Sequence, residues 1–119
     1  MPNLRIEEKG VFEIPVGTRL VNAIEANGGE PLHRCGGNAR CTTCRVEFLD
    51  GEPQKMTQSE KEKLQAGGNL GKFRLSCQCL VEEDMHVKVL MPFSKSGLDD
   101  PGSAPTDGIQ PEPVVWGAK

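Results

Sequence analysis

A chain of 119 residues with a formal charge of −3 has the length of one domain and lacks the basic surface that nucleic-acid binding needs. Hydrophobic residues make up 36% of the chain and aromatic residues 4%, so we expect a thin, aliphatic core. The sequence shows no signal-peptide pattern and no apolar run of the roughly 20 residues that a membrane span needs. These features favour a cytoplasmic protein whose partners are basic proteins.

The first half of the chain carries a hairpin pattern and then a helix pattern. Apolar residues on both sides of Glu8–Lys9–Gly10 predict a hairpin that turns there. Thr18 is expected to cap a helix that runs to about residue 26, because apolar residues recur there at helical spacing. Asn27–Gly28–Gly29 is a plausible stop for this helix.

The second half predicts a strand, a helix and two further strands. The first strand, residues 45–49, is closed by the turn signal Asp50–Gly51. Thr57 and Glu60 have capping-box spacing and open a helix to about residue 66. Strands are expected at 73–77 and 85–90, with Val87 and Val89 facing the core. This order predicts an α+β fold, a mixed sheet with one main helix packed on it.

Residues 94–119 differ in composition from residues 1–93, which we expect to form the domain. The segment holds four prolines and four glycines and has neither a helical nor a strand period, so it is interpreted as a tail. It ends in one apolar group, Val114–Val115–Trp116. We favour a terminus that folds back on the domain over a docking motif for a partner.

Five cysteines in a chain without a secretion pattern favour metal binding over disulfide formation. Three of them share one aperiodic stretch, and the other two follow 32 residues later as Cys77-Gln-Cys79. Such a loop can wrap one side of a cluster of two metal ions, and a distant cysteine can close the other side. Gly36 and Gly37 let the backbone bend so that its N–H groups point at sulfur, which stabilises a negatively charged cluster.

The segments RCGGNARCTTC (34–44) and RLSCQ (74–78) resemble the [2Fe–2S] ferredoxins of the β-grasp fold, in the adrenodoxin-like and bacterial branch with C-x5-C-x2-C spacing. The resemblance covers residues 3–91. It implies a β-grasp fold and one [2Fe–2S] cluster per chain, held by Cys35, Cys41, Cys44 and Cys77. Cys79 has no ligand role in this pattern and is expected to be a small buried residue.

The resemblance also implies a function. The chain would be a soluble one-electron carrier, a monomer without catalytic turnover of its own, that shuttles electrons between a ferredoxin reductase and an acceptor oxidoreductase. Family members that serve cytochromes P450 carry an acidic recognition helix. Here the matching segment, residues 59–64, alternates in sign and is interpreted as a solvated helix face.

Two charged groups remain open as partner contacts. The acidic triplet Glu82–Glu83–Asp84 is either a docking patch or an ordinary turn in water. The basic rim of Arg34, Arg40 and Arg45 either contacts partners or packs the cysteine loop.

Two alternatives keep the cysteines but change the role. A structural zinc module for protein interaction would use Cys41 and Cys44 together with Cys77 and Cys79, although this leaves Cys35 without a purpose. A second alternative keeps the cluster in a redox sensor or in a fixed subunit of a larger oxidoreductase, and the tail is what favours it.

Overall fold

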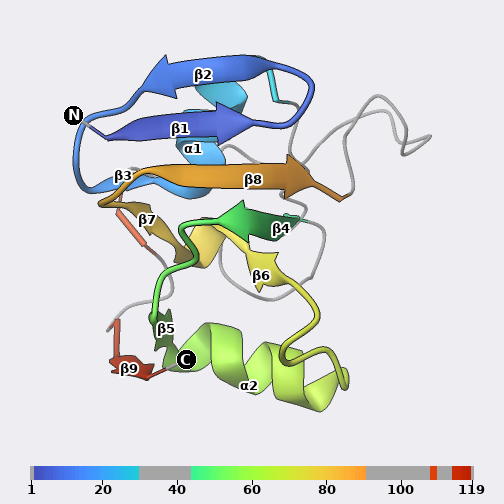
Figure 1. Ribbon diagram of the computed structural model, residues 1–119. Helices are drawn as coiled ribbons and strands as arrows, with labels where there is room; N and C mark the ends of the chain where they lie inside the picture. The colour runs from blue at the N-terminus through green and yellow to red at the C-terminus, as the bar shows by residue number, and fades with distance from the viewer. Residues whose placement is uncertain (1, 30–43, 91–107, 110–113, 119) are drawn as a thin grey trace.

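The computed structural model describes residues 2–29, 44–90, 108–109 and 114–118 (Figure 1). In chain order its elements are β1 (Asn3–Ile6), β2 (Gly10–Glu13), β3 (Thr18–Arg19), α1 (Leu20–Ala26), β4 (Arg45–Asp50), β5 (Lys55–Thr57), α2 (Gln58–Ala66), β6 (Arg74–Leu75), the 3-10 helix η1 (Ser76–Gln78), β7 (Leu80–Val81), β8 (Met85–Val89) and β9 (Trp116–Ala118). The expected loop ligands Cys35 and Cys41 lie outside the described residues.

Five strands form one mixed sheet in the order β2-β1-β8-β4-β6. β1 and β2 make the predicted hairpin, and β1 runs parallel to β8 while the other neighbours are antiparallel. Helix α1 lies across one face of this sheet, and α2 lies beyond its β6 edge, next to β5 and β9 (Figure 1). This is the α+β arrangement that the sequence predicts.

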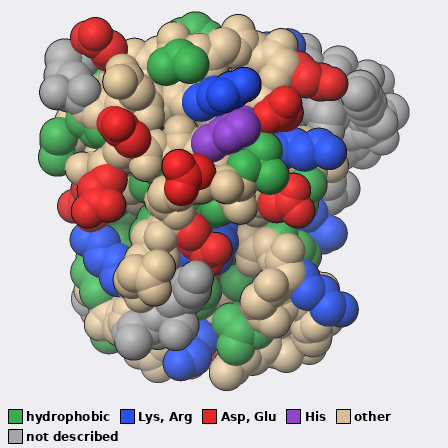
Figure 2. Space-filling view, in the orientation of Figure 1, with side chains coloured by type: hydrophobic (Ala, Val, Ile, Leu, Met, Phe, Trp, Pro, Cys, Tyr) green, Lys and Arg blue, Asp and Glu red, His purple; other side chains and the backbone are tan. Residues whose placement is uncertain are grey.

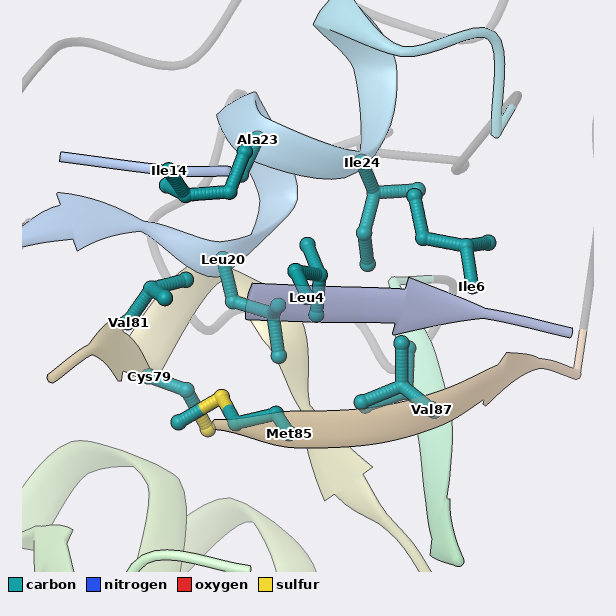
Figure 3. Close-up of a cluster of buried hydrophobic side chains, with 11 residues drawn as sticks. Leu4, Ile6, Ile14, Leu20, Ala23, Ile24, Cys79, Val81, Met85 and Val87 are labelled. Atoms are coloured by element: carbon teal, nitrogen blue, oxygen red, sulfur yellow. The ribbon is translucent and has the colours of Figure 1, made fainter. Parts of the chain in front are cut away.

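The main core lies between α1 and the sheet. Leu20 and Ile24 of α1 point toward the side of the sheet that carries Leu4 and Ile6 of β1, and all of these side chains are buried (Figure 3). Along β1 buried and exposed residues alternate, as expected for a strand with one face on the core. Val87 also belongs to this core, as predicted.

Two expected boundaries are wrong for local reasons. Thr18 does not cap the helix, because Arg19 occupies the N-cap position and Thr18 lies in β3, where its backbone pairs with Val81 and its hydroxyl donates to the carbonyl of Pro15 at 2.7 Å. Helix α1 therefore begins at Leu20. The strand expected at 73–77 ends at Leu75, and the chain then turns through η1.

A second, smaller core lies at the α2 end of the molecule. It consists of Val21, Cys44, Met56, Leu64, Phe73, Leu75 and Cys77. This core joins α1, β5, α2 and β6, and it contains both described members of the predicted ligand set.

No helix in the described part of the chain is long and apolar enough to cross a membrane.

Candidate metal centre

Cys44 and Cys77 are far apart in the sequence but belong to the same buried cluster. Their exposed fractions are 2% and 0%. Cys44 stands directly before β4, and Cys77 is the middle residue of η1. Two buried thiols brought together from separate segments, one of them the last cysteine of the predicted loop, are the donor chemistry that a thiolate-ligated metal needs.

Ser76 ties these two segments together. Its backbone N–H donates to the Cys44 carbonyl oxygen at 3.0 Å, and its hydroxyl donates to the same oxygen at 2.7 Å. Ser76 is fully buried. A carbonyl that accepts two hydrogen bonds in a dry interior holds its peptide in one orientation. Ser76 therefore fixes the backbone of one predicted ligand from the residue beside the other.

Arg19 holds the backbone of Cys77. Its Nε and Nη2 atoms donate to the Cys77 carbonyl oxygen at 3.1 and 2.7 Å, and the side chain is fully buried. Because a buried guanidinium is costly unless its donors are used, this contact fixes both partners. Sequence reasoning did not single out Arg19, since nothing local marks a charged residue at the start of a helix as buried.

A series of hydrogen bonds connects the Cys77 sulfur to the first turn of α2. The Gln78 Nε2 atom lies 3.7 Å from the Cys77 sulfur in a hydrogen bond, and Gln78 Oε1 accepts from the Thr57 hydroxyl at 2.6 Å. The Thr57 oxygen also accepts from the Glu60 N–H at 3.2 Å, which is the predicted helix cap. Thr57 and Gln78 are 2% and 1% exposed.

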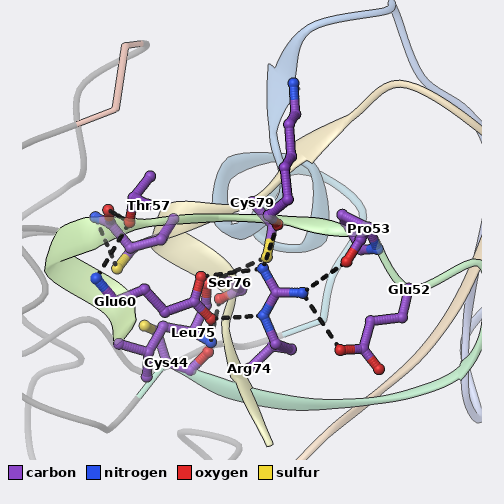
Figure 4. Close-up of polar contacts among 12 residues, drawn as sticks. Cys44, Glu52, Pro53, Thr57, Glu60, Arg74, Leu75, Ser76 and Cys79 are labelled. Carbon is purple, nitrogen blue, oxygen red and sulfur yellow. Dashed lines mark hydrogen bonds and ion pairs between the residues drawn. The ribbon is translucent and has the colours of Figure 1, made fainter. Parts of the chain in front are cut away.

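Glu60 and Arg74 form a buried ion pair, which corrects the interpretation of residues 59–64 as a solvated helix face at Glu60, whereas Lys61 and Glu62 are exposed as predicted. Arg74 Nε lies 2.8 Å from Glu60 Oε2, which also accepts from the Leu75 N–H at 2.9 Å (Figure 4). The other Arg74 nitrogens donate to the Pro53 and Lys55 carbonyls and to Glu52 (Figure 4). Glu60 is fully buried because this arginine compensates its charge.

The ion pair also affects protonation. Burial alone would lower the pKa of Arg74, but its hydrogen bond to Glu60 and the neighbouring acidic groups outweigh burial and raise the pKa above its usual range. Arg74 therefore stays charged. It anchors β6, the strand that leads into Cys77, to the first turn of α2.

Cys79 lies in a different environment from the two predicted ligands. It belongs to the main core, and its sulfur contacts the Leu75 carbonyl oxygen at 3.5 Å (Figures 3 and 4). Burial, followed by the charge of Glu60, raises the pKa of the Cys79 thiol well above its usual range. Cys79 is therefore packed as a small buried residue, as the sequence predicts.

The zinc alternative requires Cys44, Cys77 and Cys79 around one ion. Among the described residues, which include these three cysteines, no group of three or more His, Cys, Asp or Glu side chains could hold a metal ion. No disulfide links the three either. The described part of the chain thus gives the zinc module no support.

The charged groups left open by the sequence have structural contacts. Glu82 pairs with Lys55 at 2.7 Å, and Asp84 accepts from the Asn3 N–H at 2.8 Å, so two members of the acidic triplet have partners within the chain. Arg45 lies over the Phe73 ring at 4.3 Å, while Arg34 and Arg40 lie outside the described residues. Acidic and basic side chains are interspersed on the visible face (Figure 2).

Comparison with known proteins identifies the class. The family model for 2Fe-2S iron-sulfur cluster binding domains matches residues 4–82, and the chain belongs to this family. Its fold is therefore the β-grasp of the [2Fe–2S] ferredoxins, its cofactor is a [2Fe–2S] cluster and its activity is electron transfer.

Individual relatives fall into two kinds. The ISC-like [2Fe-2S] ferredoxin FdxB of Pseudomonas putida is 25% identical, with a TM-score of 0.60 over 75% of this chain and 92% of that one. Putidaredoxin from Pseudomonas putida, in the reduced form of a cysteine-to-serine variant, is 21% identical, with a TM-score of 0.53 over 76% of this chain and 96% of that one, and shares the fold. A relative from Methylococcus capsulatus, one component of its Na(+)-translocating NADH-quinone reductase, is 30% identical over 88 residues, which is 71% of this chain and 20% of the relative. The chain thus spans about a fifth of the length of the curated relatives that it matches.

Proposed function

We propose that this chain is a one-electron carrier that takes electrons from a reductase and delivers them to an acceptor oxidoreductase, as a monomer and without turnover of its own. When bound, the [2Fe–2S] cluster gains and loses the electron. We assign Cys35, Cys41, Cys44 and Cys77 as its ligands. The cytoplasmic location and the domain boundary at residue 93 belong to the same proposal.

One observation carries the proposal: Cys44 and Cys77 belong to the same group of buried side chains, and Ser76, the neighbour of Cys77, donates a hydrogen bond to the Cys44 carbonyl. The chain's own groups then do three things. Arg19 and Ser76 fix the two cysteine backbones, the apolar side chains around them exclude water, and the Gln78 amide donates to a sulfur. Likeness to FdxB, a ferredoxin that this chain covers over 92% of its length, supports a stand-alone carrier.

The test is a visible absorption spectrum with low-temperature EPR, before and after dithionite, on protein purified without oxygen. We expect a red-brown protein that is EPR-silent when oxidised and gives a spin-½ signal after one electron. Serine at any of the four assigned ligands should prevent a normal cluster, whereas Cys79→Ser should leave the visible spectrum nearly intact. Bleaching by Cys79→Ser with a normal spectrum in Cys35→Ser would refute the assignment.

A second candidate is a cluster-bearing part of a larger oxidoreductase. The observation that favours it is the match to a reductase component of which this chain covers 20%. Affinity purification of the full chain from its native cells separates the two. A stoichiometric complex that survives high salt supports the larger assembly, and recovery of the chain alone, with reduction by a generic ferredoxin reductase, supports the carrier.

A further inference from the structure

The C-terminal strand is bound to the part of the fold that leads to Cys77. β9 pairs antiparallel with β5, with Lys55, Met56 and Thr57 opposite Ala118, Gly117 and Trp116. The Gln58 N–H, the first amide of α2, donates to the Val115 carbonyl oxygen at 2.8 Å. The first amides of a helix have no partner within the helix, so the tail supplies one.

Side chains strengthen the same attachment. The Lys55 ammonium lies 4.5 Å from the centre of the Trp116 ring and 2.7 Å from Glu82. Lys55 thus joins the tail to the turn that precedes β8. The strand pairing, one helix amide and one cation–π contact converge on residues 55–58, and Thr57 lies in the middle of them.

Thr57 orients the Gln78 side chain through a hydrogen bond. Its oxygen accepts from the Glu60 N–H, and its hydroxyl proton then points to Gln78 Oε1 at 2.6 Å. An amide whose oxygen faces a donor presents its NH2 group on the opposite branch. That branch meets the Cys77 sulfur at 3.7 Å. Each of these three hydrogen bonds thus pairs a donor with an acceptor.

We propose that β9 is a positioning element of the redox centre: it holds Thr57 so that the Thr57–Gln78 hydrogen bond directs the Gln78 amide at the Cys77 sulfur. This inference rests on the proposed role of Cys77 as a ligand. A donor to thiolate sulfur favours the more negative, reduced state and raises the reduction potential. The tail therefore acts on the potential although its own residues lie outside the family match.

The experiment measures midpoint potentials by EPR-monitored titration of the full-length wild-type holoprotein and four variants. Gln78→Met removes the donor at similar length, and Gly117→Pro removes an N–H from the β5–β9 ladder. Val115→Ala is the matched control, because this side chain is half exposed and the substitution keeps the backbone carbonyl that accepts from the Gln58 N–H. The double variant Gln78→Met/Gly117→Pro completes a cycle.

We expect Gln78→Met to lower the equilibrium constant for reduction roughly threefold, or about 28 mV for one electron. Gly117→Pro should lower the midpoint potential by a smaller amount, and Val115→Ala should leave it unchanged. The double variant should have the same midpoint potential as Gln78→Met. Unchanged potentials in Gln78→Met or in Gly117→Pro overturn the proposal, as do additive shifts in the double variant.

Two measurements keep these outcomes apart from folding defects and from failure of the proposed function. If Gly117→Pro does not fold, Trp116→Ala, which removes the ring over Lys55, replaces it in the cycle with the same expectation. A normal cluster spectrum in Cys77→Ser refutes the ligand assignment itself. When Cys77→Ser does lose the cluster, the potentials of the other variants decide the tail's role alone.

Discussion

Ser76 and Cys44 are joined by two hydrogen bonds to one oxygen: the Ser76 N–H and hydroxyl both donate to the Cys44 carbonyl, at 3.0 and 2.7 Å. Because Ser76 is the residue before Cys77, these two hydrogen bonds hold the segments of two predicted ligands together. Both bonds link residues 32 positions apart, and Ser76 is fully buried.

Ser76→Ala should loosen the cluster site without removing a ligand. It deletes the 2.7 Å bond and keeps the backbone bond, for a loss of about 1 kcal/mol. We expect cluster loss in urea, followed as bleaching of visible absorbance, to become roughly fivefold faster. Ser59→Ala, in the first turn of α2, is the control and should change the rate little. Equal rates in both variants would contradict the role of Ser76.

Breaking the Glu60–Arg74 pair should be strongly destabilising. Arg74→Leu leaves the fully buried Glu60 carboxylate without its guanidinium, which typically costs about 3–5 kcal/mol. The urea midpoint of Arg74→Leu should fall sharply. Lys72 is an exposed cation close to β6, and Lys72→Leu should change the free energy of unfolding by less than about 0.5 kcal/mol. Glu60→Leu/Arg74→Leu should recover part of the loss, and a double variant as unstable as the sum of its singles would argue against the pair.

The Cys79 thiol should make stability fall at alkaline pH. Its pKa is raised in the folded state, so an unfolded chain releases this proton near about pH 8.5 while the folded chain keeps it. The contribution is fully present below the unfolded pKa and is lost as pH rises toward the folded pKa. The ratio of bleaching half-times in urea, wild type over Cys79→Ala, should decline between about pH 8 and pH 10. A ratio that stays constant or rises would show that the folded thiol is not protected.

Gly51 is required by space as well as by backbone conformation. Its φ is +74°, and a Cβ there would overlap the Asp84 carbonyl oxygen, at the turn where Asp84 also holds Asn3. Gly68 has a similar φ of +70° but open space around it. Gly68→Ala should cost about 1–2 kcal/mol from the left-handed conformation alone, and Gly51→Ala about 1–3 kcal/mol more from overlap. Thermal melting of the two variants separates these effects, and equal losses would contradict the close approach.

Long-range charge should show in the salt dependence of electron transfer. The chain carries a formal charge of −3 before any cluster is counted. Oxidation of the reduced protein by cytochrome c, a basic acceptor, should slow as salt rises from about 10 to about 300 mM, whereas oxidation by ferricyanide, an anion, should speed up. Stopped-flow traces with both acceptors make the comparison. Parallel responses would show that net charge does not guide association.

Local signals in the sequence were enough for the longer elements and for the chemistry, but not for the short strands β3, β5, β7 and β9. The hairpin at Glu8–Lys9–Gly10, the cap at Thr57 and the end of α1 at Asn27 each depend on a few adjacent residues, and the structure confirms them. Cysteine spacing predicted the family and the cofactor, which the family match confirms. Thr18 misled because a threonine is common both at helix caps and in turns, and here it lies in β3 while Arg19 takes the N-cap position.

Only the tertiary structure decided what surrounds the cysteines. Glu60, in a segment of alternating charge, becomes fully buried because Arg74 arrives from a strand 14 residues later and supplies its partner. Arg19, Ser76 and Gln78 acquire their roles only when η1 packs against β3, β4 and β5. The sequence determined which groups could bind a cluster, because ligand type and spacing are local properties. The orientation of those groups depends on contacts across 32 to 58 positions, which local patterns do not encode.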